Sequence, residues 1–98
     1  MRYDIENNVC CIKLSGEIDI VNADVFKKDA TEILERENKD LVFDCTNLDF
    51  VDSTALGAFV AVQKQAAARG LTMKLKNVKP RIQKLFTITA VDSLIEIA

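Results

Sequence analysis

The chain has 98 residues, the size of one domain, and its 49% hydrophobic and 29% charged composition is typical of a globular protein. It contains no histidine, which excludes a histidine-dependent catalytic triad and any histidine-containing metal site. No apolar run approaches the roughly 20 residues that span a bilayer, and no signal-peptide-like stretch follows Arg2. We therefore expect a single domain over residues 1–98, cytoplasmic and without a membrane span.

Charge is distributed unevenly along the chain. Residues 1–52 contain 13 acidic and 6 basic side chains, whereas residues 53–91 contain 7 basic side chains and no acidic one. A basic half can indicate nucleic-acid binding, but its two aromatic residues, Phe59 and Phe86, occupy apolar-face positions and do not alternate with the basic residues. We expect no direct nucleic-acid contact. The separation of an acidic and a basic half of the chain instead favours a protein partner.

The first part of the chain predicts a hairpin followed by a helix. Strands are expected over residues 2–6 and 9–15, joined by an Asn-Asn pair that tolerates the positive φ of a tight turn. Residues 16–21 are expected to be a loop. A helix should then run from an N-cap at Asn22 to the break at residues 38–40. Its apolar stripe comprises Phe26, Ala30, Ile33 and Leu34.

The second part continues the alternation of strands and helices. The continuous apolar residues 41–43 are typical of a strand buried on both faces. Residues 46–52 are predicted to be a loop, after which Ser53 should cap a long helix that ends at Arg69, with Gly70 at the C′ position. The remaining elements are expected to be a strand, a helix and a strand, over residues 71–76, from Pro80 onwards and over residues 94–97.

The resulting order, ββαβαβαβ, predicts the α/β class. A mostly parallel mixed sheet should carry the N-terminal hairpin strand as an antiparallel edge, with right-handed crossovers and the helices packed on the sheet. The order of the strands within the sheet does not follow from the sequence. The cysteines, Cys10, Cys11 and Cys45, are most simply buried thiols, since adjacent strand residues point to opposite faces and cannot share a metal.

The segment around Ser53 carries the strongest functional signal. The serine lies at a predicted helix N-terminus, where free N–H groups favour an anion, although a serine here is most simply an N-cap. Three acidic residues precede it, at Asp44, Asp49 and Asp52. The helix is apolar on almost every side, so some of its small residues should lie either under a neighbouring helix or in an exposed patch; these are Ala55, Ala58 and Val62. Gly57 inside the helix suggests a close backbone approach.

Residues 52–57, Asp-Ser-Thr-Ala-Leu-Gly, resemble the Asp-Ser-[Ser/Thr]-[Gly/Ala]-Leu-Gly signature of the STAS domain family, and more narrowly that of bacterial anti-sigma factor antagonists. Similar segments flank the signature, at residues 14–19, 44–50 and 84–91. Ala55 stands where glycine is more usual. Such domains usually continue into another helix beyond the position of Ala98, so the resemblance implies that this C-terminal helix is absent or truncated here.

The resemblance also implies a function. In that family an anti-sigma factor, a serine kinase with an ATPase fold, phosphorylates the signature serine, and a serine phosphatase reverses the step. Carried over, Ser53 is the phosphorylation site of a switch that binds the anti-sigma factor only when unphosphorylated and so frees a sigma factor for transcription. The implied partner-binding residues are Asp19, Asp52, Ser53, Thr54, Ala55 and Ala58. A phosphoacceptor needs no nucleotide loop or catalytic group of its own, so we expect no enzymatic activity, cofactor or metal.

Alternative functions remain open at this point. Within the same fold, the domain could be a non-phosphorylated scaffold subunit of a transport or stress-signalling assembly, with Ser53 a simple cap. A phospho-aspartate receiver would use Asp44 as the acceptor and would need a Mg²⁺-binding acidic pair, for which Glu17 and Asp19 are the nearest candidates. A metabolic enzyme is the least supported, because no pair of titratable residues has a spacing that forms a pocket.

Overall fold

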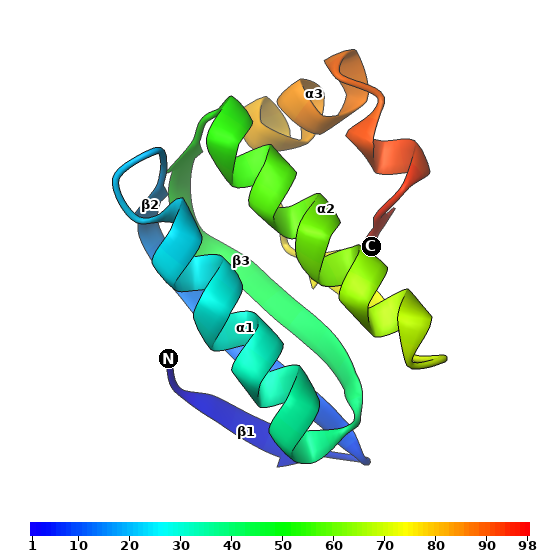
Figure 1. Ribbon diagram of the computed structural model, residues 1–98. Helices are drawn as coiled ribbons and strands as arrows, with labels where there is room; N and C mark the ends of the chain where they lie inside the picture. Colours follow the sequence, from blue (N-terminus) through cyan, green and yellow to red (C-terminus); the bar gives the residue numbers. More distant parts are fainter.

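The computed structural model describes residues 1–98, and its elements follow the predicted order (Figure 1). The strands are β1 (Tyr3–Glu6), β2 (Val9–Ile18), β3 (Asp40–Val51), β4 (Met73–Lys76) and β5 (Glu96–Ile97), and the helices are α1 (Ala23–Glu37), α2 (Ser53–Ala68) and α3 (Pro80–Ile88). A short 3-10 turn, Val91–Ser93, precedes β5 and was not among the predicted elements. The turn after the first strand has the expected conformation, with φ of 51° at Asn7 and 65° at Asn8.

The five strands form one sheet in the order β1-β2-β3-β4-β5. β1 pairs with β2 antiparallel, and all other pairs are parallel, which confirms the predicted mixed sheet. Because each right-handed crossover steps to the next strand in the same direction, the helices all fall on one face. Helices α1 and α2 lie side by side across that face, with α3 beyond α2 (Figure 1). The opposite face of the sheet has no helical cover.

Two strands are longer than the sequence suggested. The predicted loop over residues 46–52 is mostly the continuation of β3, and β2 runs through Gly16 to Ile18. The pairing of these strands shifts register twice, between Lys13 and Ser15 and between Gly16 and Glu17, so apolar and polar residues no longer alternate with a period of two. This irregularity explains why the sequence pattern predicts a loop where the structure has a strand.

Four phenylalanine rings from four elements meet in the core between the sheet and the helices. The Phe59 ring lies 4.8 Å from that of Phe26, 6.1 Å from that of Phe43 and 5.8 Å from that of Phe86, measured between centroids. All four side chains are buried. Phe59 is therefore the residue through which α2 is fixed to α1, β3 and α3 at once, and this fixes the position of the helix N-terminus.

Truncating this ring should be costly. We expect Phe59→Ala to lower the free energy of unfolding by about 3–5 kcal/mol, because a fully buried aromatic side chain leaves a cavity. Phe50, which is 48% exposed, is a matched control, and Phe50→Ala should cost less than about 1 kcal/mol. Urea denaturation of both variants measures the difference, and equal losses would contradict this description of the core.

Candidate functional site

The N-terminus of α2 begins immediately after the long strand β3. Asp52 occupies the N-cap position in an extended conformation, and its Oδ1 accepts a hydrogen bond of 2.9 Å from the Ala55 N–H group. Ser53 was predicted to be the cap, and this prediction is wrong: Ser53 is the first helical residue and is exposed. Because the Asp52 carboxylate provides the cap, the Ser53 hydroxyl is free of that role.

A second segment lies against this helix end, the loop between β2 and α1. The Ile20 N–H group donates a hydrogen bond of 2.9 Å to Oδ2 of Asp52, so one carboxylate joins the loop to α2. Within the loop, Oδ1 of Asp19 accepts from the Val21 N–H group at 3.0 Å. Asn22 occupies the N-cap position of α1, as predicted, but its side chain makes no cap hydrogen bond. It instead accepts from the Asp19 N–H group and donates to the Glu17 carbonyl oxygen, both at 2.9 Å.

Three exposed aliphatic side chains lie in this loop and in the first turn of α1 that follows it. Ile20, Val21 and Val25 are 76%, 86% and 61% exposed, and we call them the aliphatic patch. The sequence pattern does not identify them as a functional surface. A signal was nevertheless present, because Val25 lies outside the apolar stripe of α1 and the other two lie in a predicted loop. Exposed aliphatic residues beside a polar group are typical of a protein-binding surface.

The small residues of α2 separate into a buried and an exposed set. Ala55 and Ala58 are buried under the packing of α2 with α1 and the sheet, so the interpretation that they contact a partner must be corrected. Val62 is also buried, which selects the neighbouring-helix alternative for all three. In the first two turns of the helix the exposed positions are Ser53, Thr54 and Gly57. A Cβ added at Gly57 would meet no atom of the chain within 4 Å, so no part of this chain makes the close approach that the glycine suggested.

The three acidic residues before Ser53 do not gather around it. Asp49 is exposed and forms an ion pair with Lys79, and this contact lowers the pKa of the Asp49 carboxyl. Arg81 donates a hydrogen bond of 2.6 Å to the carbonyl oxygen of Asp49. Asp44 alternates with the buried Phe43 and so faces the side of the sheet without helices. Only Asp52 is in direct contact with the start of α2.

Asp44 is instead part of a local hydrogen-bond network. Its Oδ1 accepts from the Thr46 hydroxyl at 2.6 Å, from the Thr46 N–H group at 3.1 Å and from the Asn77 side chain at 3.1 Å. These hydrogen bonds, the Thr46 hydroxyl first, lower the pKa of Asp44 to about 2. The strand register pairs Glu17 with Phe50, about 20 Å along β3 from Asp44 at ~3.3 Å per residue. The structure therefore does not support a receiver site that combines Asp44 with Glu17 and Asp19.

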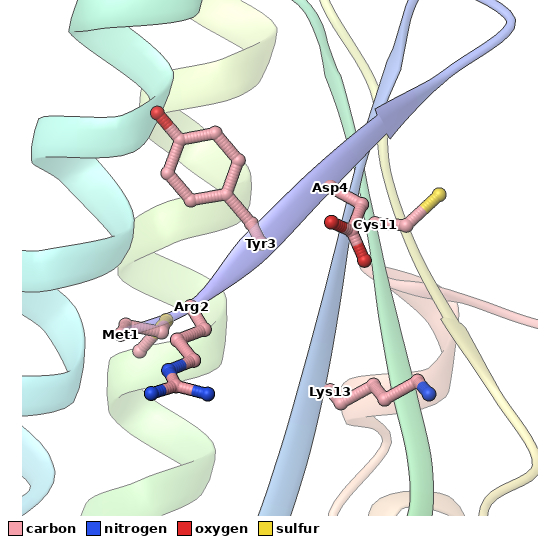
Figure 2. Close-up of a pocket in the computed structure, with 6 residues that line it drawn as sticks. All are labelled: Met1, Arg2, Tyr3, Asp4, Cys11 and Lys13. Carbon is pink, nitrogen blue, oxygen red and sulfur yellow. The ribbon is translucent and has the colours of Figure 1, made fainter.

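A surface hollow of about 630 Å³ lies away from Ser53, at the β1 edge (Figure 2). It is lined by Met1, Arg2, Tyr3, Asp4, Cys11 and Lys13. Tyr3 points toward α1, where its hydroxyl donates to Glu37, whereas Cys11 and Lys13 project to the other side (Figure 2). The hollow combines side chains of diverging direction and forms no catalytic arrangement.

The thiols and the remaining ionisable groups offer no alternative site. Cys10 and Cys45 are buried, and burial raises the pKa of both, that of Cys45 to about 12. Cys11 is partly exposed on the opposite face of the sheet, so the expectation of buried thiols holds for two of the three. No three cysteine, aspartate or glutamate side chains lie close enough together to bind a metal ion. None of the helices combines the length and hydrophobicity that crossing a membrane requires.

Comparison with known proteins places this geometry in a family. A family model described as the STAS domain matches residues 1–98. The chain belongs to the STAS domain family. This STAS domain is 32% identical over 87 residues to an anti-sigma-B factor antagonist of Bacillus subtilis, covering 89% of this chain and 79% of that protein.

Solved structures agree on the fold. An anti-sigma factor antagonist from Mycobacterium paratuberculosis superposes with a TM-score of 0.80 at 19% identity, over 98% of this chain and 81% of the other. The unphosphorylated form of SpoIIAA superposes with a TM-score of 0.74 at 16% identity, over 99% of this chain and 86% of the other. The phosphorylated form of this Bacillus protein superposes with a TM-score of 0.70 at 18% identity, over 99% of this chain and 91% of the other. At these identities the structures show a shared fold.

The Asp44 network predicts a pH-dependent contribution to stability. Its folded-state pKa of about 2 lies below the ordinary value of 3.8, so the stabilisation is present above about pH 4 and is lost as the pH falls through 2. We expect Asp44→Ala to lower the free energy of unfolding by about 1 kcal/mol at pH 7, a value that allows for solvent screening of this partly exposed carboxylate. The loss should become progressively smaller toward pH 2. Urea denaturation at a series of pH values measures this.

Thr46→Val is the matched variant for this experiment, because it removes the hydroxyl that lowers the Asp44 pKa most. In that background the loss of the Asp44 contribution should occur at higher pH. A cost of Asp44→Ala that stays constant from pH 7 to pH 2 would show that the carboxylate does not act as described.

Proposed function

We propose that this STAS domain is an anti-sigma factor antagonist, a protein-binding switch that is controlled by phosphorylation of Ser53. Unphosphorylated, it binds an anti-sigma factor kinase in the cytoplasm and frees the sigma factor; phosphorylated, it releases the kinase, and a serine phosphatase resets it. The observation that carries the proposal is the exposed Ser53 hydroxyl, relieved of capping by Asp52 and adjacent to the aliphatic patch. The names of its relatives support the same function.

The division of chemistry between the partners follows from the residues present. Phosphoryl transfer requires ATP, Mg²⁺ and a group that accepts the serine proton. This chain has no Gly-x-x-x-x-Gly-Lys phosphate loop and no histidine. The kinase must therefore supply all three, and this domain supplies the hydroxyl and a surface for docking. The proposed contact surface consists of Asp19, Asp52, Ser53, Thr54, Gly57 and the aliphatic patch.

Phosphorylation should act at the interface and leave the fold intact. A phosphate group adds about −1.5 to −2 charges at neutral pH. At the first position of a helix this charge is favoured by the dipole, by roughly 0.3–1 kcal/mol, so the domain should stay folded. Against a partner surface that accommodates a small hydroxyl, the same dianion must be desolvated, which is costly. The switch therefore requires no refolding.

Phosphate should be transferred to one residue. We expect that incubation with ATP, Mg²⁺ and an anti-sigma factor kinase of the same organism adds a single phosphate, which peptide mass spectrometry locates at Ser53. Ser53→Ala should accept none, whereas Thr54→Ala, a matched control at the neighbouring exposed hydroxyl, should still accept one phosphate at Ser53. A phosphate that persists in Ser53→Ala would contradict the assignment.

Binding measured with ADP in place of ATP completes this test, since no phosphate is then transferred. Ser53→Ala should bind the kinase about as tightly as the wild type, and Ser53→Asp at least about tenfold more weakly, the equivalent of ~1.4 kcal/mol. Equal affinity of the alanine and aspartate variants would exclude an electrostatic switch at this residue.

Substitution of Gly57 by alanine should change stability and kinase binding in opposite directions. Gly57 lies one helical turn beyond Ser53 on the exposed face, and an added methyl group would meet nothing in the chain. Gly57→Ala should therefore raise the free energy of unfolding by about 0.5–1 kcal/mol, as expected for a helix interior. If the partner packs against this backbone, the same variant should bind the kinase more weakly. Calorimetry and thermal denaturation separate the two effects, and unchanged affinity would remove Gly57 from the interface.

A further inference from the structure

The carboxylate of Asp52 connects two segments that are distant in sequence. Its Oδ1 accepts from the Ala55 N–H group of α2, and its Oδ2 accepts from the Ile20 N–H group of the β2–α1 loop, each at 2.9 Å. A cap alone requires only one acceptor atom, which serine, threonine or asparagine also provides. An ionised carboxylate is the short side chain that offers two equivalent oxygens. The second oxygen therefore has a use that helix capping does not explain.

The loop held by Oδ2 is itself a tight turn. Asp19 and Asn22 close it through hydrogen bonds to the N–H groups of Val21 and Asp19, and Asn22 also bonds to the Glu17 carbonyl oxygen. At its base, the Asp52 N–H group reaches the Ile18 carbonyl oxygen at a long 3.4 Å. These hydrogen bonds make the turn one compact unit. The side-chain contact with Asp52 ties Ile20, and with it Val21, to the residue that precedes Ser53.

The placement of these two side chains contributes little to folding, because Ile20 and Val21 are 76% and 86% exposed. Burial of so little apolar surface does not fix their position, so the fold holds them through backbone hydrogen bonds instead. Ordering an exposed loop before association lowers the entropic cost of binding. The geometry therefore favours a role in docking over a role in stability.

We propose that Asp52 is a positioning residue of the acceptor site, which holds the Ile20–Val21 turn beside Ser53 so that turn and serine present one preformed surface to the kinase. This inference rests on the proposed function and refines the assignment of Asp52, which acts through the loop and not as a contact of its own. Asp52 should influence KM for this domain as a substrate of the kinase far more than kcat.

Two substitutions separate the tether from the cap. Asp52→Asn keeps one side-chain oxygen for the Ala55 N–H group but turns an NH₂ group toward Ile20, and Asp52→Ser caps with a hydroxyl that is too short to reach the loop. In both variants we expect the Ile20 amide hydrogen to exchange at least about tenfold faster than in the wild type, measured by NMR. The exchange rate of the Ala55 amide should change by less than about threefold. Affinity for the ADP-loaded kinase should fall about 5- to 20-fold, and KM should rise while kcat stays within about twofold.

Val62→Ala is the matched control, because it removes buried core volume ten residues after Asp52, about 15 Å along α2 at ~1.5 Å per residue. It should destabilise the domain and leave both Ile20 exchange and kinase affinity unchanged. Unchanged Ile20 exchange in Asp52→Asn, or faster exchange with wild-type affinity, would overturn the positioning role. Failure of the wild-type chain to bind or accept phosphate would instead overturn the proposed function, and with it the docking role, while the exchange result would still report on the tether.

Discussion

The structure around Ser53 depends on one carboxylate at the end of β3. Parallel strands β2 and β3 finish at the same edge of the sheet, which brings the β2–α1 loop and the start of α2 together. Asp52 then uses one oxygen for each of them. Because this side chain occupies the cap position, the next residue begins the helix with an exposed hydroxyl. The accessibility of Ser53 is thus a consequence of local hydrogen bonding.

The packing of α2 determines how little of it faces solvent near the serine. Phe59 fixes the helix against three other elements. The small side chains of Ala55 and Ala58 are buried in the core and do not reach the surface. What remains outside is a narrow strip with Ser53 and Gly57. A partner can approach the backbone of that strip closely, while the aliphatic patch on the neighbouring loop and the start of α1 supplies apolar area beside it.

The class, the order of elements and the antiparallel edge strand could be predicted from the sequence, because periodicity and turn residues such as Asn7-Asn8 act locally. The extent of β3 could not, since two register shifts interrupt its alternation. The signature identified Ser53 as the candidate acceptor, but the identity of the cap depends on backbone angles at Asp52, and the burial of Ala55 and Ala58 depends on where α1 packs. The hydrogen bond between Asp52 and Ile20 joins residues 32 positions apart, so no local sequence pattern could predict it.

The central claim is that the surface formed by Ser53, Gly57 and the aliphatic patch is where the kinase docks. NMR chemical-shift mapping of the labelled domain, titrated with unlabelled ADP-loaded anti-sigma factor kinase, tests this directly. The account predicts that the perturbed amides cluster at Ile20, Val21, Val25, Ser53 and Gly57. Perturbations concentrated instead on the helix-free face of the sheet, around Cys11 and Lys13, would contradict it.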